Sequence, residues 1–181
     1  RHDVMTKILV SDFLGFCDCA KTIKRLSSLA DVCLLKSLSI LQKIYKQDFL
    51  ILCMGKLGCG ELNFSSDIDL IFCVTDNSFD IKKAMPMAQK IIQILNQNTV
   101  DSFVFRVDVR LRPFGGAGAL VLSEKQFLDY LTKDARSWER YVMMKARVLT
   151  LDPKNSLNLQ KGIDHFVYRP YRDFTVNDTI I

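Results

Sequence analysis

Two aspartates spaced two residues apart carry the clearest chemistry in this chain. Asp67 and Asp69 belong to an alternating polar and apolar segment, which predicts a β-strand. Side chains two residues apart on a strand point to the same face, so the two carboxylates would lie side by side. Mg²⁺ is commonly held by one or two carboxylates together with the phosphates of a substrate. The pair therefore predicts a metal and phosphate site, although the same alternation also fits an ordinary half-buried strand.

Glycines and a third carboxylate strengthen the chemical interpretation. Gly55, Gly58 and Gly60 precede the aspartates and would let the backbone approach a phosphate closely. Downstream, Asp108 lies among arginines in a second alternating segment, residues 103–111. Three carboxylates from two strands suit two metal ions about 3.5–4 Å apart, which clamp the attacking and leaving oxygens at phosphorus. The three aspartates are therefore the predicted catalytic and metal-binding residues, with Mg²⁺ or Mn²⁺ as the expected cofactor.

Five further residues are candidate contacts for a nucleotide or its phosphates: Gly55, Lys56, Ser66, Arg110 and Arg112. Arginine side chains and backbone N–H groups can neutralise and position a phosphoryl group. Ser66 could instead only cap the turn before the strand. Arg110 and Arg112 occupy alternate positions of one segment, so their spacing does not rank them.

These residues resemble a known family. The matching motifs are, in chain order, Gly55 to Gly58, Glu61 to Asn63, Ser65 to Leu70, Val107 to Pro113, Trp138 to Arg140 and Lys145 to Arg147. Their order and spacing are similar to the bifunctional glutamine synthetase adenylyltransferase/adenylyl-removing enzymes of the DNA polymerase beta superfamily. The resemblance runs from about Phe49 to Thr150, and more weakly over residues 166–174. It implies a polymerase-beta-like nucleotidyltransferase domain, with glutamine synthetase and a small nitrogen-signalling regulatory protein as partners.

That family has two catalytic halves. One attaches AMP to a tyrosine of glutamine synthetase, and the other removes it by phosphorolysis, which releases ADP. Residues 61–66, 103–108 and 112–115 resemble the amino-terminal, adenylyl-removing half. Cys59 and Gly60 depart from the more glycine-rich turn of the family, and the segment between Phe72 and Asp108 is short. The alternatives are ATP-dependent adenylylation of glutamine synthetase, another nucleotidyltransferase, or a non-catalytic nucleotide-sensing module.

Hydrophobic periodicity predicts the elements that position these residues. The expected elements are a helix from Leu26 through Lys46, strands at Phe49–Met54 and Asp67–Val74, a helix across Ala84–Leu95, strands at Phe103–Leu111 and Ala119–Leu122, and helices from Ser123 to Arg147. Pro86 is expected near the first turn of its helix, and Ser123 is expected to cap the next one. The predicted fold class is α+β, with a mixed β-sheet flanked by helices.

The last predicted helices also offer a surface for a protein partner. Trp138 is expected to be their core anchor, while Lys133, Arg136 and Arg140 are expected to face outward toward glutamine synthetase. Lys145 and Arg147 fall on a different face, from which they could reach the nucleotide or the partner.

Length and composition fit one catalytic domain. Residues 1–150 are predicted to form it, including the amino-terminal helices, and residues 151–181 to form a linker and the start of a truncated helical segment. The six cysteines lack zinc-site spacing, which predicts reduced thiols and a cytoplasmic location. Residues 104–147 hold nine Lys or Arg against five Asp or Glu, but no long basic block that would indicate nucleic acid. No signal peptide or membrane span is expected.

Overall fold

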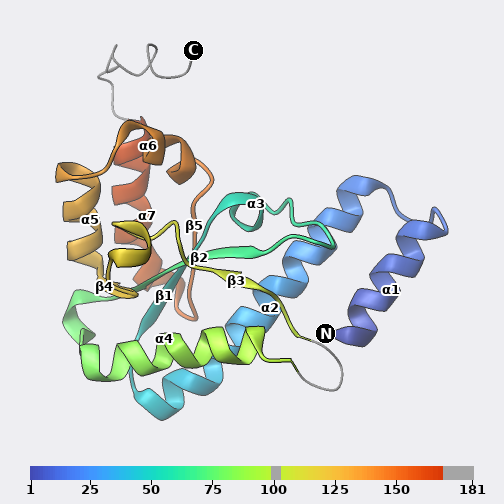
Figure 1. The fold of residues 1–181 in the computed structure, drawn as a ribbon, viewed down its shortest axis with the longest axis horizontal. Helices are drawn as coiled ribbons and strands as arrows, with labels where there is room; N and C mark the ends of the chain where they lie inside the picture. The colour runs from blue at the N-terminus through green and yellow to red at the C-terminus, as the bar shows by residue number, and fades with distance from the viewer. Residues whose placement is uncertain (99–102, 169–181) are drawn as a thin grey trace.

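The computed structural model describes residues 1–98 and 103–168 (Figure 1). The elements are α1 (His2–Phe13), α2 (Cys19–Tyr45), β1 (Phe49–Cys53), α3 (Gly55–Gly58), β2 (Ile68–Val74), η1 (Asp76–Ser78), α4 (Ile81–Asn96), β3 (Val107–Asp108), η2 (Gly115–Ala117), β4 (Val121–Ser123), α5 (Glu124–Lys133), α6 (Ser137–Met143), β5 (Arg147–Leu149) and α7 (Pro153–Tyr168). Within these described residues, no helix is both long enough and apolar enough to cross a membrane.

The sheet is mixed, and β2 is its centre. The strand order is β3-β2-β1-β5, with β4 paired to β2 outside this path. β1 is antiparallel to β2 and to β5, whereas β3 and β4 are parallel to β2. Asp69 pairs with Asp108, and Phe72–Val74 pairs with Val121–Ser123. The parallel pairing of β2 with β3 thus places two of the predicted carboxylates, Asp69 and Asp108, opposite each other.

Helices cover both faces of this sheet (Figure 1). Phe49, Ile51, Leu70 and Phe72 belong to a core that includes residues of α1, α2 and α4. Leu50, Leu52, Ile71 and Cys73 belong to a second core with α5, α6 and α7. Burial on both faces explains why β1 and most of β2 are continuous apolar runs in the sequence. The predicted α+β class, a mixed sheet flanked by helices, is confirmed.

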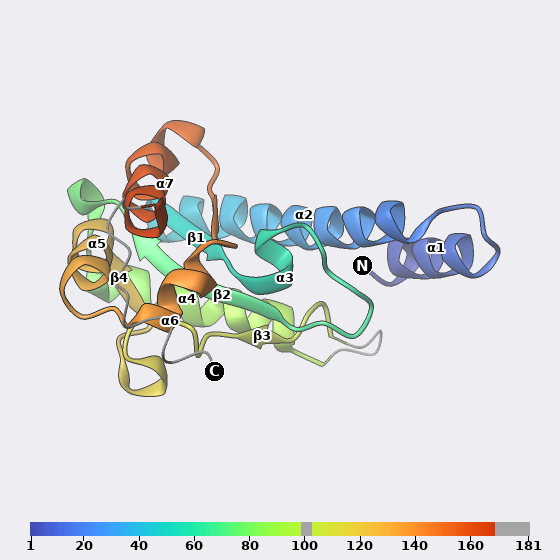
Figure 2. The ribbon, with the colours of Figure 1, turned by 90° about the horizontal axis from the view of Figure 1, so that it is seen from above.

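The amino-terminal helices form a hairpin that extends past the sheet (Figure 2). α2 begins after Asp18, whose side chain accepts a hydrogen bond from the Lys21 amide, and ends at Lys46 in a left-handed conformation. At the other side of the sheet, Ser123 accepts from the Gln126 amide in a capping box, as the sequence predicts. Local capping therefore fixes where both helices begin.

The structure corrects several predicted elements. The strand expected at Phe103–Leu111 is reduced to β3, because the Arg110 amide donates to the Asp108 carboxylate at 2.8 Å and turns the chain. Pro86 lies in the second turn of α4, on its exposed side, where water can reach the Lys82 carbonyl that the missing N–H leaves free. Trp138 is 52% exposed and is not a core anchor.

The chain after residue 150 continues as α7. Leu159, Ile163 and Phe166 of this helix are buried in the second core, against β1, β2 and α5. The predicted division at residue 150 stays a prediction, and α7 packs on the same sheet as the elements before it. Residues 169–181 of the predicted terminal segment lie outside the described residues.

Candidate active site

Gly55 begins the site, because it connects β1 to α3 directly beside a carboxylate. Its φ is +53°, and a Cβ added there would lie 2.8 Å from Asp69 Oδ2. Gly58, at the end of α3, is equally constrained, since a Cβ there would lie 1.8 Å from the Lys145 carbonyl oxygen. The two glycines therefore let the β1–α3 turn pack tightly between the Asp69 side chain and the chain that leads into β5.

Asp69 and Asp108 are brought together by the register of β2 and β3. They are paired residues of parallel strands, so their side chains leave the same face of the sheet. Asp67 is exposed and lies just before β2, because the strand predicted to start at Asp67 begins one residue later, at Ile68. Burial, and then the charges of Asp108 and Asp67, raise the pKa of Asp69, while Arg110 opposes this effect. Both neighbouring carboxylates thus act electrostatically on Asp69.

Two arginines neutralise the flanking carboxylates. Arg110 Nε lies 2.8 Å from Asp108 Oδ2, and these hydrogen bonds hold the pKa of Asp108 below its ordinary value. Arg106 Nε donates to Asp67 Oδ1 at 2.5 Å, and its Nη2 donates to the Ser65 carbonyl at 2.9 Å. Both arginines are more than half exposed, so each can exchange its carboxylate for another anion at the surface.

The remaining predicted phosphate contacts have different surroundings. Arg112 donates to the carbonyls of Val109, Gly116 and Gly118, so its guanidinium holds the loop that contains η2. Ser66 donates to Asn63 Oδ1 at 2.7 Å and accepts from the Asn63 amide at 3.3 Å, which is the turn-capping alternative. Lys56 lies exposed on α3.

Two supports of the site were not expected from the sequence. The Asn96 side chain, at the end of α4, accepts from the Val107 amide at 2.8 Å and so anchors β3. Arg147 pairs with Asp31 of α2 at 2.8 Å and donates to the Leu57 and Gly58 carbonyls. Arg147 therefore buttresses α3 from behind. Its partner lies 116 residues away, and no local pattern indicates that contact.

The three carboxylates have the ligand type that a divalent cation prefers, but their positions in the structure do not form a metal site. Their donor set is entirely oxygen, and an added positive charge would reverse the repulsion that helps raise the pKa of Asp69. Among residues 1–98 and 103–168, however, no three acidic, histidine or cysteine side chains converge closely enough to hold an ion. Arg106 and Arg110 occupy oxygens of Asp67 and Asp108 instead. A metal ion at these carboxylates would compete with the two guanidinium groups for their oxygens.

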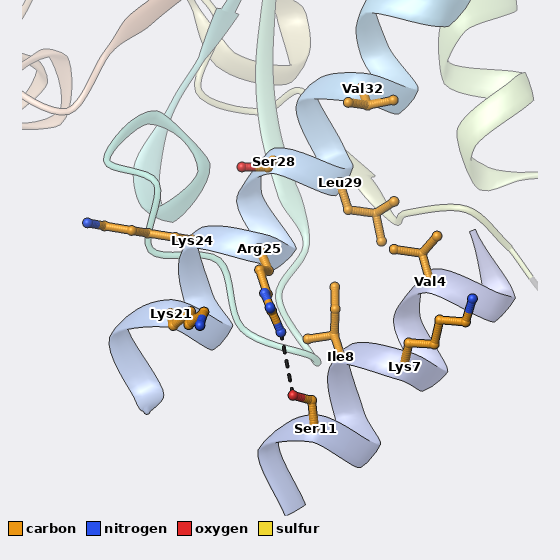
Figure 3. A pocket seen from close by; sticks show the side chains of 10 residues that line it. All are labelled: Val4, Lys7, Ile8, Ser11, Lys21, Lys24, Arg25, Ser28, Leu29 and Val32. Carbon is orange, nitrogen blue, oxygen red and sulfur yellow. Dashed lines mark hydrogen bonds between the residues drawn. The ribbon is translucent and has the colours of Figure 1, made fainter. Parts of the chain in front are cut away.

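Away from the predicted site, a groove lies between α1 and α2 (Figure 3). It measures about 820 Å³, and Val4, Ile8 and Leu29 are among the apolar side chains that line it. Arg25 points across it toward Ser11, at 3.5 Å. None of the described residues that line this groove belongs to the predicted site.

The mixed sheet flanked by helices is consistent with the polymerase-beta-like nucleotidyltransferase fold. Residues 1–161 match the model of a family described as glutamate-ammonia ligase adenylyltransferase. Because the match covers most of the chain, this protein belongs to that family. Glutamate-ammonia ligase is glutamine synthetase, so the family implies glutamine synthetase and a nucleotide as substrates.

Proposed function

We propose that this chain removes AMP from a modified tyrosine of glutamine synthetase by metal-dependent phosphorolysis. The observation that carries the proposal is the register of Asp69 opposite Asp108, beside the glycine turn at Gly55. Asp69 lies between the Gly55 backbone and Asp108, and Arg110 binds Asp108, so these are groups that phosphoryl transfer could use. The removing direction is supported by the resemblance of residues 61–66, 103–108 and 112–115 to the amino-terminal half of the family.

In the reaction, an oxygen of inorganic phosphate attacks the phosphorus of the tyrosine-linked AMP. The bond from phosphorus to the tyrosine oxygen breaks, the phenolate leaves and takes up a proton, and the other product is ADP. Asp67, Asp69 and Asp108 would hold Mg²⁺ or Mn²⁺, which when bound supplies charge neutralisation at the phosphoryl oxygens. Arg110, once released from Asp108, would bind a phosphate oxygen, while Gly55 keeps the backbone close.

The test is incubation with adenylylated glutamine synthetase, phosphate and either Mg²⁺ or Mn²⁺, followed by nucleotide analysis. Formation of ADP together with unmodified glutamine synthetase is the expected result. Labelling of unmodified glutamine synthetase by ATP, with no ADP release from the modified form, would assign the adenylylating direction instead. Binding of nucleotide without either reaction would favour the sensing module.

Regulation and location belong to the same proposal. The family's chemistry links the reaction to nitrogen supply, so a small nitrogen-signalling protein is the proposed regulator. All six cysteines are free thiols, which is compatible with the proposed cytoplasmic location.

A further inference from the structure

A cavity of about 480 Å³ lies between the loop containing η2, the end of α5 and the start of α6. In Figures 1 and 2 this loop lies beside α5. Arg110 lines the cavity, and its guanidinium also binds Asp108. Arg110 therefore connects the cavity to Asp108 of the proposed reaction centre. Its volume lies within the range of small-ligand sites, about 300–1,000 Å³.

Exposed aromatic rings form part of its wall. Phe114 and Trp138 both line the cavity, and they are 66% and 52% exposed. Phe114 packs edge-on against Tyr130, with ring centroids 4.9 Å apart. Tyr130 is fixed in turn by a hydrogen bond from its hydroxyl to Glu139 at 2.7 Å. A ligand with a flat ring would cover aromatic surface that is held in place but open to water.

Three arginines line the same space, together with the carboxylates of Asp134 and Glu139. Arg110 and Arg136 both line it, while the third arginine of the wall, Arg112, is committed to loop carbonyls. Glu139 is already engaged, because it accepts from the Tyr130 hydroxyl and the Arg136 amide. Within the described residues, the Arg136 guanidinium makes no ion pair with a carboxylate. Aromatic rings beside the Arg136 guanidinium, with Arg110 exposed enough to exchange Asp108 for another anion, match a ligand that joins an aromatic base to a phosphate.

We propose that this cavity seats a purine mononucleotide, the AMP group of the reaction. The base stacks on Trp138 with Phe114 on the cavity wall, and the phosphate lies at the Arg110 end, beside Asp108. Arg136 supplies a second positive charge. This inference rests on the proposed function for its choice of nucleotide, but its test measures binding alone.

Trp138 is the only tryptophan of the chain, so its fluorescence reports directly on this cavity. Titration of the wild-type protein with AMP is expected to quench that fluorescence to saturation. Adenosine, which lacks the phosphate, and ribose 5-phosphate, which lacks the base, are each expected to bind about tenfold or more weakly, the scale of one charged contact or one stacked ring. Absence of quenching, or equal binding of either fragment, would overturn the proposal.

Matched variants locate the site by equilibrium dialysis with labelled AMP. Trp138→Ala is expected to weaken binding about tenfold. Tyr141→Ala is the control, because Tyr141 lies on the same helix, is 49% exposed and is outside the cavity lining. Arg136→Ala is expected to weaken AMP but not adenosine, whereas Lys133→Ala should change neither. Wild-type affinity in Trp138→Ala would place the nucleotide elsewhere.

The outcomes for the cavity and for the reaction can be told apart. Circular dichroism shows whether Trp138→Ala folds. If it does not fold, the relative affinities of the wild-type protein for AMP, adenosine and ribose 5-phosphate test the cavity proposal. Selective AMP binding without ADP release from adenylylated glutamine synthetase would support the cavity and reject the proposed function. ADP release by a protein whose AMP affinity is unchanged in Trp138→Ala would support the function and reject the cavity.

Discussion

Asp69 carries a charge that the folded protein disfavours. Because its pKa is raised, its contribution to stability is full below the ordinary value of 3.8 and is lost as the pH rises through the raised pKa. Asp69→Asn is therefore expected to raise the melting temperature at pH 7. The same change should lower turnover about 100-fold or more, the scale of losing one preorganised charged group. Thermal melts and initial rates at saturating metal check both effects, and near wild-type turnover would remove Asp69 from the metal site.

Asp108 should show the opposite dependence on pH. Arg110 lowers the pKa of Asp108, so the stabilisation is present above the ordinary value of 3.8 and is lost as the pH falls through the lowered pKa. Asp108→Asn is expected to lower the melting temperature at pH 7, with a difference that shrinks as the solution is acidified. A difference that grows toward acid pH would contradict the Arg110 pairing. Turnover should again fall about 100-fold or more.

At the scale of the element, the β1–α3 turn can be tested with two glycines of similar conformation. Gly55 and Gly60 have φ values of +53° and +70°, but only at Gly55 would a Cβ meet another group, Asp69 Oδ2. Gly60→Ala is expected to cost about 1–2 kcal/mol for the left-handed backbone alone. Gly55→Ala should cost more in urea denaturation and should also reduce turnover, since the carboxylate must move. Equal effects would show that the contact with Asp69 is unimportant.

The sequence predicts the two inner strands well because they are buried on both faces and read as apolar runs. It overextends β3, since alternation continues through residues 103–111 while the hydrogen bond from the Arg110 backbone amide to the Asp108 carboxylate turns the chain. The juxtaposition of Asp69 with Asp108 follows from strand periodicity once pairing is assumed. The roles of Asn96 and Arg147 do not, because they depend on contacts between elements distant in the chain.

Across the whole molecule, the two cores share the same strands. Leu159 of α7 and Leu38 of α2 are both fully buried, on opposite faces of the sheet. Leu159→Ala and Leu38→Ala are each expected to cost about 2–5 kcal/mol. If α7 belongs to the catalytic domain, both variants should unfold in one transition seen alike by circular dichroism and by Trp138 fluorescence. A separate, earlier transition in Leu159→Ala alone would support the division at residue 150.

The two-residue length of β3 has a kinetic consequence. β1 and β2 pair over five residues, but β3 holds β2 over only two, with the Ile68 amide donating to the Arg106 carbonyl and the Val107 amide to Asn96. Brief opening of this seam would separate Asp69 from Asp108 while both cores stay intact. In native-state hydrogen exchange, the Ile68 and Val107 amides should exchange through subglobal openings, ahead of the amides within the β1–β2 ladder. A low concentration of denaturant would then abolish turnover before it unfolds the protein.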